Sequence, residues 1–208
     1  MSETAVRVLD VAARLAQTRG FNGFSYADVA LKLGITKASL HYHFASKAQL
    51  GSALIVRYTH GFCAALAQID GPDSQHTLRQ YVQLYEDVLV RDEMCLCGMF
   101  AAEYSTLPAQ MQQELMRFFD ANDTWLAAVL QRGRTLGGLQ FDGAALEAAR
   151  TLTAGLEGAM LLSRSYREPA RFATISSRLL SGLGVAPPAV RSVRLQKKPR
   201  ASRRVAVN

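Results

Sequence analysis

The stretch Ser25–Leu50, SYADVALKLGITKASLHYHFASKAQL, predicts two short helices around a tight turn, followed by the start of a third helix. Ser25 supplies the hydroxyl that an N-cap needs, and Asp28 follows it at the spacing of a capping box. Gly34 is expected to end the first helix, because glycine adopts a left-handed backbone at little cost, and Thr36 can cap the next one. These signals together predict a helix-turn-helix.

The second helix of this pair is expected to turn a polar face outward. If Leu40 points into the protein, Phe44 lies about 40° from it around the helix axis, so both side chains anchor the helix. The opposite face carries hydroxyl, imidazole and phenol groups and no carboxylate that would repel phosphate. An ordinary amphipathic helix with a solvated face is the alternative. We predict a surface that reads a DNA groove, with base contacts from Lys37, Ser39 and His41, and mainly phosphate contacts from Ser25, Thr36, Tyr42, His43 and Lys47.

The net charge of +7 over 208 residues is unevenly distributed along the chain. Residues 184–208 hold seven basic side chains and no acidic one, whereas residues 1–183 hold 17 of each sign. Within that neutral part, residues 1–47 have six basic and three acidic side chains, and residues 48–183 have eleven and fourteen. This polarity favours DNA binding by the N-terminal region.

Helical signals continue through the rest of the chain, and no strand pattern accompanies them. Apolar residues recur at helical spacing over residues 8–16, before Gly20. A helix is predicted from Ser46, capped together with Gln49, to about Ile69. Further helices are predicted from a Ser74 cap to a polar turn at 91–93, within the short segment 95–106, from Pro108 to Gly137, from an Asp142 cap over 143–165, and from Pro169 to near Gly182. We therefore predict an all-α fold of about nine helices.

Several other classes of protein do not fit this sequence. Three cysteines are too few for a disulfide framework, the N-terminus lacks the apolar core of a secretory signal, and no stretch is long and apolar enough to span a membrane, so a cytoplasmic protein is expected. No metal is expected, because His41 and His43 diverge by about 160° on a helix and the paired cysteines have no histidine near them in sequence. We expect neither an enzyme nor a cofactor. Glu103 and Glu157 could form a catalytic carboxyl pair, but no nucleophile, phosphate loop or dinucleotide motif accompanies them.

The segment LGITKASLHYHFASKAQL, residues 33–50, resembles the TetR/AcrR family of bacterial transcriptional regulators. His41 departs from the family pattern, which more often has tyrosine there. The resemblance implies an all-helical homodimer that binds a palindromic DNA operator and releases it on binding a small-molecule inducer. It also implies a DNA-binding domain at 1–47 and a ligand-binding and dimerisation domain at 48–184, which leaves 185–208 as a basic tail, expected to be disordered. The family motif is carried by Ala30, Gly34, Ile35, Thr36, Leu40, Tyr42, His43, Phe44 and Lys47.

A second resemblance covers most of residues 94–164. The segments CLCGMFAAEYSTLP and GLEGAMLLSR are similar to a TetR branch whose members answer to reactive electrophiles. In that branch a cysteine opens the sixth helix, and Cys95 matches it. A helix N-terminus can lower a thiol pKa and make such a cysteine a sensor, although simple packing is the alternative. A small hydrophobic or electrophilic inducer is therefore expected, with these ligand candidates: Cys95, Met99, Glu103, Tyr104, Phe118, Trp125, Glu157 and Leu161.

Two functional interpretations remain open at this point. The first is a repressor released from DNA by a small molecule, and the alternative is a similar DNA-binding protein regulated by a protein partner without any small ligand. In either case the resemblance implies dimerisation through the last two predicted helices. Small residues and leucines suit close helix packing there, and the candidates are Gly155, Gly158, Ala159, Leu162, Leu179 and Leu180.

Overall fold

The computed structural model describes residues 1–69, 71 and 73–186, and this part of the chain is entirely helical. The prediction of an all-α fold with about nine helices is confirmed. The bounds are α1 Glu3–Arg19, α2 Tyr26–Leu33, α3 Lys37–His43, α4 Lys47–Gln68, α5 Ser74–Val90, α6 Leu96–Ala102, a short 3-10 helix at Tyr104–Thr106, α7 Ala109–Thr135, α8 Ala145–Tyr166 and α9 Pro169–Ser181.

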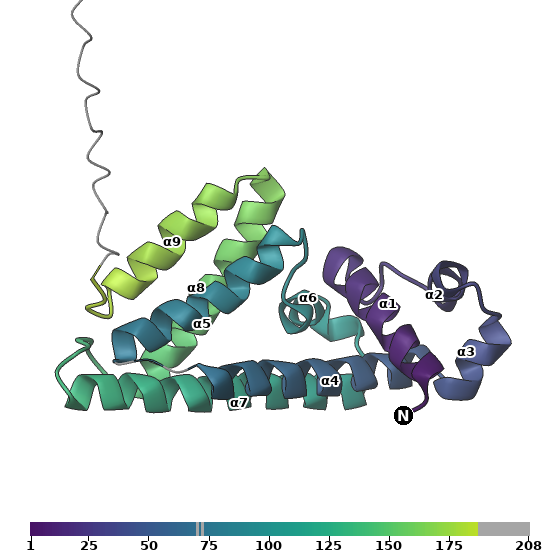
Figure 1. Cartoon of the computed structure of the whole chain (residues 1–208), viewed down its shortest axis with the longest axis horizontal. Coiled ribbons are helices and arrows are strands. Elements are labelled where there is room, and N and C mark those ends of the chain that lie inside the picture. Colours follow the sequence, from purple (N-terminus) through teal and green to yellow (C-terminus); the bar gives the residue numbers. More distant parts are fainter. Residues whose placement is uncertain (70, 72, 187–208) are drawn as a thin grey trace, which may run out of the picture.

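The first three helices form a group at one end of the molecule, seen at the right of Figure 1. Helices α4 and α7 pack side by side along one edge, and α5, α8 and α9 pack together at the other end. The short helix α6 lies between the two groups and contacts α1, α4 and α7. None of the described helices is long and apolar enough to cross a lipid bilayer.

The helix-turn-helix forms through the local contacts that its sequence predicts. The Ser25 and Asp28 side chains and backbones make a reciprocal capping box at the start of α2. Gly34 ends α2 in the left-handed region, with φ at 67°, and the Thr36 hydroxyl accepts the backbone N–H of Ser39 to start α3. Leu40 is fully buried and fixes α3 against the N-terminal core. The outer face of α3 is therefore held in a defined orientation.

Two of the predicted N-caps are wrong. Helix α5 begins one residue earlier than expected, because the carboxylate of Asp73, and not the Ser74 hydroxyl, accepts the backbone N–H of His76. Helix α8 is not capped by Asp142. Its first turn is closed instead by the Glu147 carboxylate, which accepts the backbone N–H of Ala144 at 3.1 Å. In each case another carboxylate, close in sequence, reaches the free backbone N–H groups of the first turn.

The predicted capping box at the start of α4 forms only in part. The Ser46 hydroxyl accepts the Gln49 backbone N–H, but the Gln49 side chain accepts from Ala45 instead of Ser46.

The segment predicted as a basic tail is ordered at its beginning. Val185 is buried, because the chain folds back after α9 and packs its side chain into the core. The backbone oxygen of Ala186 accepts a hydrogen bond from the Arg79 guanidinium at 2.8 Å. The remainder of that predicted tail, 187–208, lies outside the described residues.

Candidate nucleic-acid interface and ligand pocket

Helix α3 presents its polar residues on the outer surface of the N-terminal group. Tyr42 has 86% of its surface exposed, and Lys37 and His41 are also exposed. Ser39 is half-buried, and its backbone N–H donates to the Thr36 hydroxyl at 3.1 Å. No acidic residue occurs between Lys37 and His43. A side chain with this exposure contributes little to folding, so the surface is free to contact a partner.

The two histidines of α3 have different surroundings. The Nδ1 atom of His41 lies 3.2 Å from the backbone oxygen of Ala45, and its ring lies 4.7 Å from the ring of Tyr26. His43 is half-buried and its Nδ1 lies 3.5 Å from the hydroxyl of Ser2, the N-cap of α1. His41 is thus fixed by its own helix end, whereas His43 links α3 to the start of the chain.

The predicted phosphate contacts include groups that are already engaged within the protein. The hydroxyls of Ser25 and Thr36 accept helix-capping hydrogen bonds. The ammonium of Lys47 lies 4.4 Å and 4.7 Å from the ring centres of Phe21 and Phe24. Burial lowers the pKa of Lys47, and the negative charges of nearby carboxylates offset part of that effect. Lys47 therefore both anchors the aromatic pair and carries positive charge at the start of α4.

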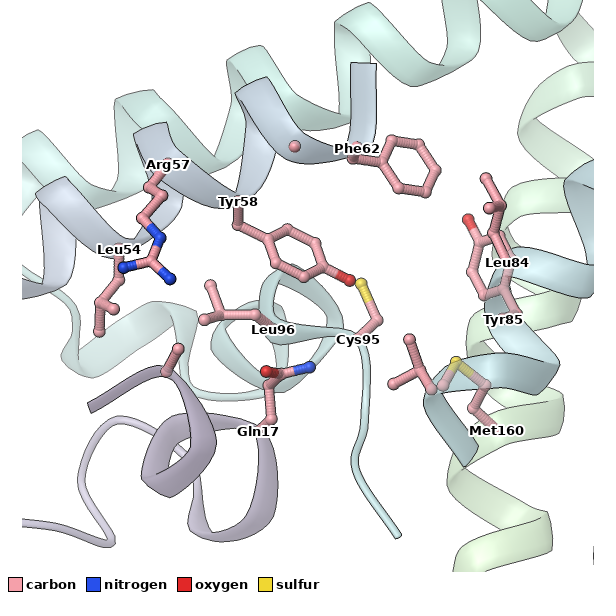
Figure 2. A pocket seen from close by; sticks show the side chains of 13 residues that line it. Gln17, Leu54, Arg57, Tyr58, Phe62, Leu84, Tyr85, Cys95, Leu96 and Met160 are labelled. Atoms are coloured by element: carbon pink, nitrogen blue, oxygen red, sulfur yellow. The ribbon is translucent and has the colours of Figure 1, made fainter. Parts of the chain in front are cut away.

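A cavity of about 330 Å³ lies where the N-terminal helices meet the rest of the chain. Helices α1, α4, α5 and α8 line it, together with Cys95 and the start of α6. Figure 2 shows Tyr58 and Tyr85 extending toward Cys95 from opposite sides. Most of the lining is apolar, and its labelled residues are Gln17, Leu54, Arg57, Tyr58, Phe62, Leu84, Tyr85, Cys95, Leu96 and Met160.

Behind this cavity the aromatic residues of α4, α5 and α7 form one cluster. The rings of Phe62 and Phe118 lie 5.3 Å apart, and the ring of Trp125 stacks on Tyr81 at 5.7 Å. The Tyr81 hydroxyl contacts that of Tyr85 and the Asn122 side chain in a buried network. Burial raises the pKa of Tyr81 to about 12, so its hydroxyl remains protonated. Phe118 and Trp125, both predicted to bind ligand, thus support the cavity from the layer behind it.

Cys95 is the N-cap of α6 and faces the cavity. Its sulfur accepts the backbone N–H of Gly98 at 3.4 Å, which is the contact that a helix N-terminus offers. Burial nevertheless raises the pKa of Cys95 well above its ordinary value, and the nearby carboxyl of Glu157 raises it further. The expected lowering of the thiol pKa is therefore outweighed, and Cys95 is a neutral thiol at neutral pH.

Glu157 lies on α8, on the inner side of the helix. Both of its carboxyl oxygens are buried, and apart from the Cys95 thiol neither has a hydrogen-bond partner within the described residues. Burial raises its pKa from 4.5 to about 7, and the neighbouring Cys95 offsets part of that effect. Glu157 and Leu161 both line a more open groove on the other side of α6, beside Gly98. The carboxyl is thus placed between this groove and the thiol of Cys95.

The remaining predicted ligand residues lie away from the cavity. Tyr104 is exposed on the 3-10 helix, and Met99 is a half-buried residue that packs against the hydrophobic core. Glu103 ends α6, and its carboxylate accepts the backbone N–H groups of Phe21 and Asn22 at 2.6 Å and 3.2 Å. Glu103 therefore joins the end of α6 to the loop that precedes α2.

The sequence analysis missed the cavity residues on α1 and α4. Tyr58 and Phe62 lie four residues apart on α4 and both face inward, a spacing that the sequence displays. Gln17 on α1 also lines the cavity, and its side chain donates to the backbone oxygen of Met94 at 3.0 Å. In return, the backbone N–H of Met94 donates to the backbone oxygen of Gln17 at 3.1 Å. This pairing is long-range, so local patterns did not indicate it.

A helix-turn-helix with an exposed polar helix, attached to a helical domain with a cavity, defines the class of DNA-binding transcriptional regulators. Residues 8–54 match the family described as bacterial regulatory proteins, tetR family. A TetR-family regulator from Agrobacterium tumefaciens of known structure is 33% identical, with 86% of this chain and 96% of that chain covered and a TM-score of 0.84. The chain belongs to the TetR family, whose members are transcription factors and not enzymes.

Other relatives extend over most of the chain. The HTH-type transcriptional repressor DhaR from Mycobacterium sp. (strain GP1) is 24% identical over 171 residues, which are 80% of this chain and 86% of DhaR. A TetR regulator from Legionella pneumophila is 30% identical, with 88% and 98% of the two chains covered and a TM-score of 0.79. The reduced form of NemR from E. coli is 24% identical, with 90% and 100% covered and a TM-score of 0.76, a likeness that shows the fold.

Proposed function

We propose that this protein is a repressor that binds a palindromic operator as a homodimer and is released by a small, largely apolar molecule. The observation that carries this proposal is the position of the cavity. It is lined by Gln17 of α1 and Tyr58 of α4 on one side and by Cys95 and Tyr85 on the other. A molecule that fills the cavity therefore touches α1 and α4, which flank the DNA-contacting helix α3 in the chain, and also touches the C-terminal helices.

The position of the cavity suggests different roles for the two parts of the chain. Residues 1–47 would contact DNA, and residues 48–184 would bind the ligand and the second subunit. Helix α4 connects the two by sequence, while α6 connects them by contact, because its end at Glu103 holds the loop at Phe21. Filling the cavity at the start of α6 is thus expected to shift α3 relative to the C-terminal helices.

The chemistry of the lining supports an uncharged ligand. The only basic side chain on the lining is Arg57, which is exposed and paired with Asp10. The polar groups that line the cavity around Cys95 are the Tyr58 and Tyr85 hydroxyls and the Cys95 thiol itself, which are neutral at neutral pH, whereas the carboxyl of Glu157 is not part of the lining. A polyanion would find no buried cation there, whereas a small aromatic or carbonyl compound suits both the apolar walls and the hydroxyl donors.

A homodimer is proposed through the outward faces of α8 and α9. Leu161 and Leu162 of α8 are 43% and 48% exposed, and a Cβ atom built at Gly158 meets no other atom within 4 Å. The other four predicted interface residues pack within the subunit instead. Ala159 and Leu180 are buried within the subunit, and Gly155 packs against Leu179.

The proposal is tested by selecting binding sites from a random duplex library with the full-length protein. Two half-sites related by two-fold symmetry are expected, because one short helix reads too few bases alone. Release of the selected duplex is then measured against a panel of small uncharged aromatic and carbonyl compounds. Leu84→Trp, which fills the cavity, is expected to reduce the response, and Val90→Trp on the exposed end of α5 is its matched control. Enrichment of no symmetric site would contradict the proposal.

A further inference from the structure

The buried carboxyl of Glu157 is the polar group that the proposed function leaves without a role. Both of its oxygens are inaccessible to water, and apart from the Cys95 thiol neither has a hydrogen-bond partner within the described residues. Such a group costs folding free energy, and a buried carboxyl is normally paired or hydrogen-bonded. Its immediate neighbour is the Cys95 thiol, which separates it from the cavity. The carboxyl therefore lies behind the one nucleophilic atom that faces the ligand.

Gly98 makes this approach possible. A Cβ atom on Gly98 would collide with Oε2 of Glu157, so the glycine leaves the space that the carboxyl occupies. The backbone N–H of the same glycine donates to the Cys95 sulfur at 3.4 Å. The carboxyl and the sulfur thus meet at one residue of α6. On the cavity side, Figure 2 shows the Tyr58 hydroxyl directly beside the Cys95 sulfur.

We propose that Glu157 and Cys95 form an acid–base pair, in which the Glu157 carboxylate takes the thiol proton as Cys95 adds to an α,β-unsaturated carbonyl compound in the cavity. This inference rests on the proposed function, because it assigns the class of molecule that enters the cavity. It gives Glu157 the role of general base, in contact with the reacting thiol.

The addition balances without an oxidant or a reductant. The thiol proton moves to a Glu157 oxygen, and the sulfur electron pair forms a bond to the β-carbon of the ligand. The π electrons of the carbon–carbon double bond move to the α-carbon and the carbonyl oxygen, where the Tyr58 hydroxyl can donate a hydrogen bond to the developing charge. The proton then returns from Glu157 to the α-carbon. The net result is addition of S–H across the double bond.

The protonation states agree with these roles. Burial places the pKa of Glu157 at about 7, so a substantial fraction is ionised at neutral pH and can accept a proton. The Cys95 thiol has a pKa well above its ordinary value, so it needs a base to react. The other titratable groups that affect this thiol or lie next to it are Tyr58 of α4, Tyr85 of α5 and Cys97 of α6, each with a raised pKa.

The test follows N-ethylmaleimide addition to each cysteine of the full-length protein at pH 7.0 by peptide mass spectrometry. Glu157→Gln is expected to slow modification of Cys95 at least tenfold, while exposed Cys63 reacts at the wild-type rate as an internal standard. A carboxylate that merely repelled the thiolate would have the opposite effect, because its removal would lower the thiol pKa and speed the reaction. A faster or unchanged rate in Glu157→Gln therefore overturns the pairing.

Gly98→Ala provides a second variant that keeps both reacting groups. The added methyl displaces the Glu157 carboxyl, so Cys95 modification is expected to slow as in Glu157→Gln, whereas Gly138→Ala, whose Cβ would meet only the backbone oxygen of Gly133 at 3.7 Å, should react like wild type. Modification of Cys95 no faster than that of buried Cys97 in the wild type would also refute the pairing. If Cys95 reacts as expected but the modified protein stays on the selected duplex, the proposed release mechanism fails while the pairing stands.

Discussion

The carboxylate of Glu103, at the C-terminal end of α6, accepts the backbone N–H of Phe21 at 2.6 Å. The first turn of α6 faces the cavity through Cys95 and Leu96, so one short helix contacts the ligand space at one end and the DNA-binding helices at the other. A second contact runs beside it, where the Arg164 guanidinium donates to the backbone oxygens of Gln17 and Thr18 at 3.2 Å and 2.8 Å. Helix α6 is therefore the shortest physical link between the two parts of the molecule.

Glu103→Ala is expected to loosen this link. The substitution leaves the backbone N–H groups of Phe21 and Asn22 without their acceptor, which costs about 1–3 kcal/mol of unfolding free energy. Thermal and urea unfolding of the full-length protein measure this loss. Glu168→Ala removes an exposed carboxylate that is paired with Arg171, and should change stability by less than about 1 kcal/mol. Equal losses in the two variants would show that the Glu103 contact contributes no more to the free energy of unfolding than an exposed ion pair does.

Lys37 and Lys47 are expected to differ although both are basic and close to DNA in the proposal. Lys37→Ala should leave stability unchanged and weaken binding to the selected duplex more than to a random one, because it removes an exposed side chain that is proposed to contact bases. Lys47→Ala removes a proposed phosphate contact and should lower the salt slope of log affinity by about 0.9. Lys47→Ala should also reduce stability by about 1 kcal/mol, because its ammonium packs over Phe21 and Phe24. Fluorescence anisotropy between 50 and 200 mM salt and urea unfolding test the two effects separately.

Tyr42→Ala is expected to weaken binding to every duplex by a similar factor without changing stability, because this side chain is 86% exposed. Ser39→Ala is expected to change the preference among sequences instead. Competition between the selected duplex and a random one distinguishes these outcomes. A Tyr42→Ala protein that lost affinity for only one of the two duplexes would assign this residue to base reading.

Substitutions of two glycines on α8 test whether its outward face forms the proposed dimer interface. Gly158→Trp should fold but remain monomeric, because nothing within the subunit lies near its Cβ. Gly155→Trp should be destabilised as a subunit, because its Cβ would lie 2.7 Å from Leu179. Analytical ultracentrifugation and thermal unfolding report the two properties. A fully dimeric Gly158→Trp protein would exclude this face as the dimer interface.

The sequence predicted those parts of the fold that depend on local contacts. The Ser25–Asp28 capping box, the left-handed Gly34 and the Thr36 cap involve residues three to nine positions apart, so the stretch that contains them was sufficient. The cavity could not be predicted in the same way. It depends on pairings such as Gln17 with Met94, 77 residues apart, and on which face of α4 turns inward.

Glu103 and Glu157 illustrate the same limit for the site. The sequence placed both among the ligand candidates as carboxylates of the C-terminal region. Their roles differ only because Glu103 meets the backbone of another helix group, whereas Glu157 is buried beside a thiol, with no other hydrogen-bond partner within the described residues. Burial and long-range contact decide the chemistry of a carboxyl, and neither is visible in its neighbours along the chain.

The last prediction concerns the dependence of stability on pH. Burial raises the pKa of Glu157 from 4.5 to about 7, so between these values the folded protein holds a proton that the unfolded chain has released. The folded state then binds more protons than the unfolded state, and the contribution of Glu157 to stability falls as the pH rises through this window. Above pH 7 the ionised carboxyl costs the folded state about 3 kcal/mol, at about 1.4 kcal/mol for each pKa unit.

Glu157→Gln removes this ionisation. The variant is expected to be more stable than wild type at pH 8 by up to about 3 kcal/mol, and the difference should shrink as the pH falls toward 4.5, where both states of the wild type are protonated. Urea unfolding at pH 5, 6, 7 and 8 and one fixed protein concentration measures this difference. Glu168→Gln, which affects an exposed pair with Arg171, should show no such trend. A stability difference that is constant with pH would mean that the pKa of Glu157 is the same in the folded and unfolded states, and that burial does not raise it.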